Sequence, residues 1–165
     1  MLDLKALIVY YTRTGQTKVV AETIRAILQC DVEELADTQK RSGLFGYMRA
    51  GRQTMKKELT VLKPLAKDPS QYDVVVVGTP VWVYNLSVPV RTYLEQNKDK
   101  IKKLAIFCTH GGKESFGAAF QSAEEITGLL AIAKLNLRTK EVKRAEHVEK
   151  TTAFVRKVEE GMAKA

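Results

Sequence analysis

The sequence predicts an α/β protein built on a doubly wound parallel sheet, and three observations support this fold class. The run YDVVVVG (72–78) is nearly continuous valine, which is typical of a strand buried on both faces of a parallel sheet. The run KLAIFCT (103–109) repeats the same pattern. Strand-like and helix-like segments also alternate along the chain. This alternation indicates parallel strands whose connecting helices cover both faces of one sheet.

Three further strands complete the predicted sheet. KALIVYY (5–11) is a short run of apolar, β-branched and aromatic residues and predicts the first strand. DVEEL (31–35) predicts the second strand, and KLNLRTKEV (134–142) alternates in hydropathy like an edge strand. Helices are predicted where apolar residues recur at helical spacing, namely at 16–29, about 88–97, about 118–130 and around 148–162.

Apolar positions on the predicted helices are expected to face the sheet. These inward positions are Val90, Tyr93, Leu94, Phe120, Ala123, Ile126, Leu130, Val148, Val155, Val158 and Met162. In contrast, His147 is expected on the surface of the last helix.

Length and composition indicate a single globular domain over residues 1–165, with an excursion at about 36–71 between the second and third strands. The chain is 45% hydrophobic and 28% charged, as in ordinary globular proteins. No apolar run is long enough for a membrane span, and we find no signal peptide. Cys30 and Cys108 do not have the spacing of a zinc site or a disulfide scaffold. We therefore expect a reduced, cytoplasmic setting without a metal site.

Three loops follow the predicted strands at the edge where doubly wound sheets bind ligands. They cover residues 12–17, 79–87 and 109–117, and all three are rich in glycine, threonine or aromatic residues. The sequence therefore predicts the ligand site at these three loops.

The first loop, TRTGQT (12–17), has the composition of a phosphate cradle. It lies between a buried strand and a helix start, where free backbone N–H groups and the helix dipole favour an anion. Gly15 permits close approach of an anion, and the threonines add hydroxyl donors. The alternative is that Thr14 or Gln16 is only an N-cap and Gly15 only a turn residue. The loop matches neither a Walker A motif nor GxGxxG.

A phosphorylation-receiver domain has the same kind of sheet but needs acidic residues at its strand ends. Here the first strand ends in Tyr10 and Tyr11, and the third ends in Gly78. The residues required for phosphoryl transfer to aspartate are therefore missing, and this class is excluded.

The three loops together resemble those of the flavodoxin-like FMN-binding proteins, in a short-chain, basic branch. TRTGQT (12–17) matches the phosphate loop T-x-T-G-x-T. GTPVWVYNLSVPVRTYL (78–94) and FCTHGGKESFG (107–117) resemble the second and third flavin loops. The resemblance implies a five-stranded parallel sheet in the order 2-1-3-4-5, with helices on both faces. In flavodoxins FMN lies where the strand order reverses, and this placement follows from the resemblance alone.

The resemblance also implies a set of FMN-binding residues. The phosphate is expected to be held by Thr12, Arg13, Thr14, Gly15, Gln16 and Thr17. The ribityl chain and the ring are expected to be bordered by Thr79, Pro80, Val81, Trp82, Tyr84 and Asn85. The pyrimidine side of the ring is expected to contact Thr109, His110, Gly111, Gly112 and Phe116. No catalytic or metal-binding residue is implied.

Three of these residues have more than one possible role. Trp82 and Tyr84 are the candidates for stacking on the ring, although Trp82 could instead be a core residue beneath its loop. His110 could donate to a flavin oxygen or move protons near neutral pH, or it could simply line the pocket.

The excursion at 36–71 concentrates much of the positive charge of a chain whose net charge is +8. Its SGLFGYMRAG part resembles a segment of the same flavodoxin-like branch. Phe45, Tyr47 and Met48 could cover the flavin or anchor the excursion to the core, and we favour anchoring. The basic residues of this stretch are Lys40, Arg41, Arg49, Arg52, Lys56, Lys57, Lys63 and Lys67.

These charges are interpreted first as a solvated face, and second as a docking face for an acidic partner or NADPH. No nucleic-acid-binding motif accompanies them, so nucleic acid is not expected as a partner. The sequence thus favours an electron carrier that passes electrons from FMN to a redox partner protein. The alternative is an FMN-dependent oxidoreductase that uses NAD(P)H and reduces quinones or similar small acceptors. A phosphate-ligand module without redox activity would require the three-loop match to be accidental.

Overall fold

The computed structural model describes residues 4–39, 41–112 and 116–164. Five parallel strands form the sheet in the order β2-β1-β3-β5-β6, which confirms the predicted order. A two-residue strand, β4 (Asn85–Leu86), pairs antiparallel with the end of β3. The parallel strands are β1 (Ala6–Tyr10), β2 (Asp31–Glu34), β3 (Val74–Trp82), β5 (Leu104–His110) and β6 (Lys134–Arg138).

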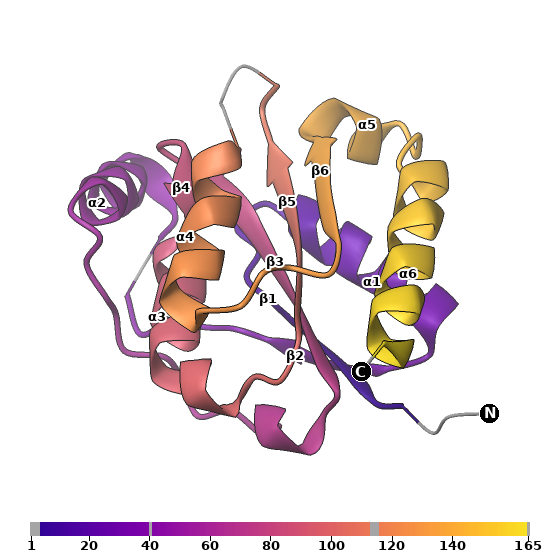
Figure 1. Cartoon of the computed structure of the whole chain (residues 1–165). Helices are drawn as coiled ribbons and strands as arrows, with labels where there is room; N and C mark the ends of the chain where they lie inside the picture. Colours follow the sequence, from indigo (N-terminus) through magenta and orange to yellow (C-terminus); the bar gives the residue numbers. More distant parts are fainter. Residues whose placement is uncertain (1–3, 40, 113–115, 165) are drawn as a thin grey trace.

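Helices cover both faces of this sheet (Figure 1). Helices α1 and α6 lie on one face, and α3 and α4 lie on the other. The bounds are α1 (Gln16–Leu28), α2 (Gly43–Met55), α3 (Val88–Asn97), α4 (Gly117–Thr127), α5 (Thr139–Lys143) and α6 (Val148–Ala163). Short 3-10 turns cover Pro69–Gln71 and Lys98–Lys100.

The alternation of side chains along the central strands explains why these strands are apolar at every position. In β1, Leu7 and Val9 face the core under α3 and α4, whereas Ile8 and Tyr10 face the core under α1 and α6. In β3 the four valines from 74 to 77 divide between the two cores in the same way. A strand between two helical layers has no solvent face, so no polar residue interrupts it.

Several predicted details of the helices and strands are wrong. Residues 134–142 do not form one strand, because β6 ends at Arg138 and α5 begins at the next residue. Leu130 lies beyond the end of α4 and is 85% exposed, and Val148 is half exposed at the first position of α6.

His147 is buried rather than on the surface, with only 4% of it exposed. Its Nε2 lies 3.1 Å from the Thr23 hydroxyl, and its carbonyl accepts hydrogen bonds from Thr151. This residue therefore joins α6 to α1.

Helix α2 occupies the excursion between β2 and β3 and packs through small residues. Its buried positions are Gly46, Ala50 and Thr54. A Cβ on Gly46 would come within 2.6 Å of the Arg41 carbonyl carbon, so only glycine permits this close approach. Phe45, Tyr47 and Met48 are 83%, 65% and 60% exposed, so the expectation that they anchor the excursion is wrong.

Arg41 does not belong to a solvated face either, because it is buried. Its Nε donates to Asp37 at 2.9 Å, its Nη2 lies 2.7 Å from the same carboxylate, and its Nη1 donates to Gln53. These contacts tie the start of the excursion to α2.

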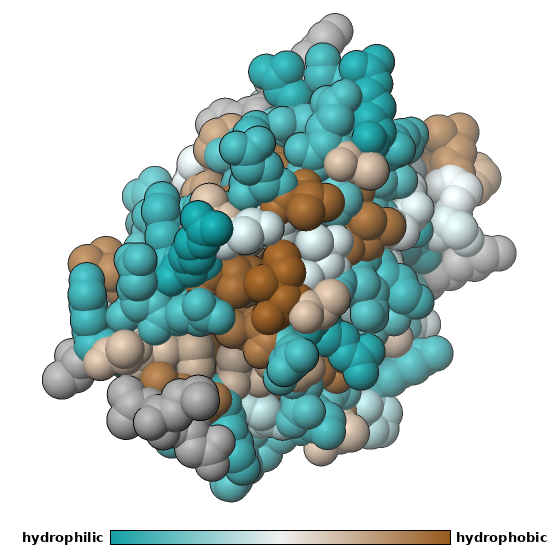
Figure 2. Space-filling model, turned by 90° about the vertical axis from the view of Figure 1, so that its right-hand side faces the viewer, coloured by the Kyte–Doolittle hydropathy of each residue, from teal (hydrophilic) through white to brown (hydrophobic). Residues whose placement is uncertain are grey.

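The face formed by α1 and α6 carries a shallow apolar hollow (Figure 2). Its apolar lining residues are Val19, Ala26, Ile27 and Val148, and Lys18 and Glu22 also line it. Within the described part of the chain, no helix is both long and apolar enough to cross a membrane.

Candidate functional site

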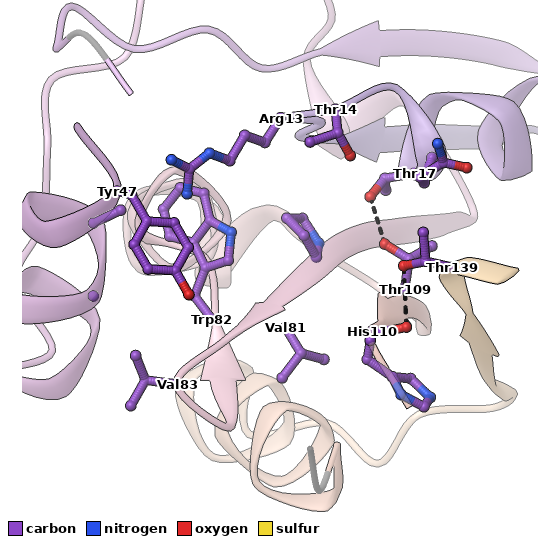
Figure 3. Close-up of a pocket in the computed structure, with 15 residues that line it drawn as sticks. Arg13, Thr14, Thr17, Tyr47, Val81, Trp82, Val83, Thr109, His110 and Thr139 are labelled. Atoms are coloured by element: carbon purple, nitrogen blue, oxygen red, sulfur yellow. Dashed lines mark hydrogen bonds between the residues drawn. The ribbon is translucent and has the colours of Figure 1, made fainter. Parts of the chain in front are cut away.

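A cavity of about 450 Å³ lies beyond the carboxyl ends of β1, β3 and β5 (Figure 3). This is the edge of the sheet, and the point in the strand order, where doubly wound proteins bind ligands. The first loop, the end of β3 and the end of β5 all contribute lining residues. Helix α2 adds one wall, and the first residue of α5 adds another contact. The three loops predicted from the sequence are therefore brought together.

The first loop forms a turn that leads directly into α1. The Gly15 N–H donates to the Thr12 hydroxyl at 3.0 Å, so Thr12 closes the turn rather than lining the cavity. Gly15 has a φ of 95°, a conformation that favours glycine over any residue with a Cβ. The N–H groups of the first helical turn have no acceptor within the helix. Thr14, Gln16 and Thr17 line the cavity beside this donor-rich end.

The third loop is joined to the first by a hydrogen bond between two buried threonines. The Oγ1 atoms of Thr17 and Thr109 are 2.9 Å apart, and either hydroxyl could donate (Figure 3). The Thr139 hydroxyl donates to the His110 carbonyl at 3.1 Å. These two hydrogen bonds connect the start of α1, the end of β5 and the start of α5.

The second loop is mostly a tight hairpin instead of an open loop. Strand β3 continues to Trp82 and pairs with β4, so that Val83 and Tyr84 form a two-residue turn. Both turn residues have positive φ, 46° and 65°, as in the turns that match the twist of a hairpin. A β-branched residue in this region of backbone conformation is uncommon and indicates local strain.

A network of buried and partly buried hydrogen bonds holds the hairpin in place. The Ser87 N–H donates to the Thr79 hydroxyl at 3.1 Å. The Asn85 side-chain oxygen accepts from the Leu86 N–H at 2.8 Å and from Arg91 Nη2 at 2.9 Å. Thr79 and Asn85 therefore support the second loop and do not line the cavity.

Trp82 lies at the wall of the cavity and is almost fully buried. Its ring meets Tyr11 edge-on, with centroids 5.5 Å apart and an interplanar angle of 87°. The Arg13 and Arg41 guanidinium carbons lie 5.8 and 5.7 Å from its centroid. Arg13 also lies 4.9 Å from the Tyr47 ring centroid, which connects the first loop to α2. Trp82 therefore packs in the core and also lines the cavity, and its stacking on the ring stays a prediction.

His110 accepts a hydrogen bond at Nδ1 from the Gly112 N–H, at 3.1 Å. Because a neutral imidazole accepts at one nitrogen and donates at the other, this contact places the proton on Nε2. Nε2 is buried and has no hydrogen-bond partner among the described residues. The ring also packs on Phe116, with centroids 5.2 Å apart. His110 therefore presents one free donor beside the cavity.

The predicted site residues divide into two groups. Those that line the cavity are Arg13, Thr14, Gln16, Thr17, Pro80, Val81, Trp82, Thr109, His110 and Gly111. Those that the structure places outside its lining are Thr12, Gly15, Thr79, Tyr84, Asn85, Gly112 and Phe116. Tyr84 is 54% exposed on the hairpin turn, so of the two predicted stacking residues only Trp82 lines the cavity.

Five lining residues were not among the predicted FMN-binding residues, namely Tyr47, Ala50, Gly51, Val83 and Thr139. From the sequence, Tyr47 could cover the flavin or anchor the excursion, and anchoring was favoured. Thr139 follows β6 directly, and the alternating pattern of 134–142 concealed the end of that strand.

The charge of the cavity favours an anionic ligand. Its described lining contains Arg13 and no aspartate or glutamate. The helix start contributes partial positive charge at the same edge. Burial raises the pKa of Cys108 to about 12, so this nearby thiol stays protonated and acts as a small apolar side chain.

Fold and site together define a doubly wound α/β protein with an anion-favouring cavity at the switch in its strand order. Residues 5–127 match the family model described as Flavodoxin. The chain therefore belongs to the flavodoxin family. A comparison with curated protein sequences finds no match.

Solved structures agree with this assignment. A flavoprotein from Lactobacillus acidophilus in complex with FMN is 25% identical and has a TM-score of 0.70; the match covers 90% of this chain and 99% of that one. The NMR structure of the apo-form of the flavoprotein from the same organism is 28% identical, with a TM-score of 0.64 over 87% of this chain and 98% of that one. Oxidised Flavodoxin 2 from Bacillus cereus shares the fold at 18% identity, with a TM-score of 0.58 over 94% and 98% of the two chains.

Proposed function

We propose that this protein binds FMN in the cavity between its three loops and serves as a redox carrier. The observation that carries the proposal is the meeting of a donor-rich helix start, an aromatic wall and an anion-favouring lining in one cavity. A volume of about 450 Å³ lies within the usual range of cofactor pockets. Bound FMN would supply reversible electron transfer, and the protein would supply binding, orientation and electrostatics.

The residues divide the work of binding by their chemistry. The first-turn N–H groups and the Thr14 hydroxyl are the proposed phosphate donors, because they lie at the positive end of α1. The wall of the cavity that contains Trp82 is proposed to border the flavin ring, since aromatic faces pair with a flat π-system. The free Nε2–H of His110 is proposed to donate to a polar atom of the ring edge.

The carrier role is proposed because the chain belongs to the flavodoxin family. Among the described lining residues, Arg13, Tyr47 and His110 are the ones that ionise, and none has a geometry that assigns it to chemistry on a second substrate. An oxidoreductase using NAD(P)H is the alternative, and it requires an open ring face for the nicotinamide.

The first experiment is to extract the cofactor of the purified protein and to identify it by chromatography. We expect FMN rather than FAD, because the proposed cradle accepts a terminal phosphate at the helix start. A chain that carries no flavin and takes up none on titration would overturn the proposal.

The second experiment separates the carrier from the enzyme. The FMN-loaded protein is mixed with NADPH and a quinone, and NADPH oxidation is followed in the steady state. A carrier is expected to show no turnover beyond that of free FMN, whereas sustained turnover would establish the oxidoreductase.

A further inference from the structure

Exposed apolar side chains concentrate on α2 and the segments beside it. Apolar residues are normally exposed singly, so a group of them at one place indicates an interaction surface. The exposed large apolar residues of this region are Leu44, Phe45, Tyr47, Met48, Met55, Leu59, Val61, Val83 and Tyr84.

The geometry of α2 places these residues in a definite order around the helix. With 3.6 residues per turn, Leu44, Met48 and Met55 share one stripe, opposite the buried Gly46, Ala50 and Thr54. Tyr47 and Gly51 lie between this stripe and the cavity, which both residues line. A Cβ on Gly51 would lie 3.6 Å from Val83 Cγ2, so the hairpin turn adjoins the helix. The stripe is therefore continuous with the wall of the proposed flavin site.

Arg49 and Arg52 lie beside the stripe on the side of α2 away from Tyr47 and the cavity, and further basic residues follow α2 in the chain. Between residues 43 and 67 there are six basic residues and one acidic residue, Glu58, so this segment carries a charge of +5. All six are exposed, and none forms a salt bridge with a described residue. They are Arg49, Arg52, Lys56, Lys57, Lys63 and Lys67. Positive charge beside an apolar stripe, without salt bridges to described residues, fits a partner of opposite charge.

We propose that the exposed face of α2, together with the Val83–Tyr84 turn, is the docking surface for an acidic partner protein. This inference rests on the proposed redox function and adds the surface and the charge of the partner. Phenylalanine, tyrosine, methionine and arginine are the residue types enriched in protein–protein interfaces. Flexible methionines such as Met48 and Met55 adapt to the shape of a partner. A protein docked here would stand next to the wall formed by Tyr47 and Trp82.

The pattern is less suited to a lipid surface. A helix that lies in a membrane interface presents an apolar face with its cations on the polar face. Here Arg52 lies beside the stripe, between Met48 and Phe45 around the helix, so a cation interrupts the exposed apolar face. The apolar surface also continues onto a hairpin turn instead of following one helix axis.

The test uses the isotopically labelled, full-length protein and two haem proteins of opposite charge as probes. Acidic cytochrome b5 is titrated into the protein at low salt, and basic cytochrome c is titrated in parallel. We expect cytochrome b5 to shift the amide signals of residues 44–56 and 83–84, and its affinity to fall as salt screens the charges. Cytochrome c is expected to bind at least tenfold more weakly.

Matched variants distinguish an effect of charge on the α2 surface from an effect of the net charge of the protein. Arg49→Glu with Arg52→Glu should weaken binding of cytochrome b5 at least tenfold at low salt. Arg156→Glu with Lys157→Glu makes the same charge change at exposed positions of α6 and should weaken it less than twofold. Phe45→Ser with Met48→Ser should weaken binding at every salt concentration, because apolar contacts are not screened.

Three results would overturn the inference. The first is an equal loss of affinity in the two charge-reversal variants. The second is a set of shifts that maps to the α1–α6 face. The third is α2-dependent binding to phosphatidylglycerol vesicles without binding of cytochrome b5. FMN uptake is measured by absorbance on the same samples. A failure of the proposed FMN binding is therefore detected separately from a failure of the docking surface. The shift map decides the docking surface with or without bound FMN.

Discussion

The hydroxyl oxygens of Thr17 and Thr109 lie 2.9 Å apart, in a buried position that joins the start of α1 to the end of β5. These residues are 92 positions apart in the chain. Thr17 is only 2% exposed, so its hydroxyl is committed to this contact before any ligand arrives. Thr14 lines the same cavity without a described side-chain hydrogen bond and remains available as a donor. The two threonines of one loop therefore have different expected roles.

This difference predicts opposite ligand profiles for two alanine variants. Thr14→Ala should weaken FMN binding by about ten- to a hundredfold and leave riboflavin binding nearly unchanged, because a hydrogen bond to a charged phosphate contributes roughly 1.5–3 kcal/mol. Thr17→Ala should weaken the binding of both ligands, because it removes the hydrogen bond that joins the first and third loops. The measurement is a fluorescence titration of each variant with FMN and with riboflavin.

The stability of the two variants provides the control. Thr17→Ala leaves the buried Thr109 hydroxyl without its partner, which costs about 1–3 kcal/mol of unfolding free energy. Thr14→Ala should change stability little. A Thr17→Ala variant that is as stable as the parent and loses FMN alone would contradict the structural role of this residue.

A second prediction uses the one tryptophan of the chain, Trp82. Because Trp82 lines the cavity, its emission should report the arrival of the flavin directly. Tryptophan emission is expected to fall severalfold on saturation with FMN, with the same midpoint as the quenching of flavin fluorescence.

The Trp82→Phe variant is the control for this assignment of the emission to Trp82. It should still bind flavin, because phenylalanine keeps an aromatic wall, but it removes the protein signal. Unchanged tryptophan emission at FMN saturation would place the ring away from Trp82.

Much of the sheet and the location of the site could be predicted from sequence. Strands β3 and β5 are buried on both faces, and such burial leaves a continuous apolar run that is hard to mistake. The loops that follow them are fixed by the rule that parallel strands end at one edge. The position of the cavity thus follows from the order of strands and helices alone.

The buried face of helix α2 could not be predicted, because its large apolar residues are exposed and its small residues are buried. Its buried face consists of Gly46, Ala50 and Thr54, while Phe45 and Met48 are exposed. Hydrophobic periodicity assigns large apolar residues to the core, so it predicts the exposed face of α2 to be the buried one. Gly51, which lines the cavity with Tyr47, was missed for the same reason, whereas Tyr47 was already a candidate to cover the flavin.

The hairpin after β3 was missed for a different physical reason. Turns of this kind usually contain glycine, asparagine or aspartate, because both central residues have positive φ. Here the positions are held by Val83 and Tyr84, so the local sequence gives no turn signal. The Thr79, Asn85 and Arg91 side chains stabilise the turn through hydrogen bonds between residues six to eight positions apart, which no turn motif contains.

A third prediction concerns acid stability. The hydrogen bond from Lys150, together with that from the Arg138 N–H, lowers the pKa of Glu141 below its ordinary value near 4.5. A carboxylate with a lowered pKa in the folded state stabilises the fold above its unfolded pKa, and this contribution is lost as the pH falls through the folded pKa. The Glu141→Gln variant should therefore be less stable than the parent at pH 6 and closer to it below pH 4.

Urea unfolding at both pH values measures this difference. Glu159→Gln is the matched control, since Glu159 is exposed on α6 and has no described salt bridge. If the two variants show the same dependence on pH, Glu141 does not contribute to acid stability.

The last prediction concerns the potential of the bound flavin, which the charge of the cavity should raise. Negative charge near a flavin opposes formation of its anionic reduced form, and positive charge favours it. The described lining holds Arg13 and no carboxylate, while Lys113 and Glu114 of the third loop lie outside the described residues. A unit charge about 7 Å from the ring, at an effective dielectric near 20, contributes roughly 2 kcal/mol. That energy corresponds to about 100 mV for one electron.

Compared with an acidic flavodoxin, this chain has one or two fewer negative charges near the ring. The potential of the second one-electron reduction step should therefore be higher by about 100–200 mV. Within this chain, Arg13→Gln should lower it by up to about 100 mV, since the variant removes the cation beside Tyr47 and Trp82. Arg156→Gln on the exposed face of α6 removes the same charge far from the cavity and should leave the potential nearly unchanged. Spectroelectrochemical titration of the three proteins measures the effect. A potential that does not respond to Arg13→Gln would mean that backbone contacts to the ring, rather than the charge of the loop, determine it.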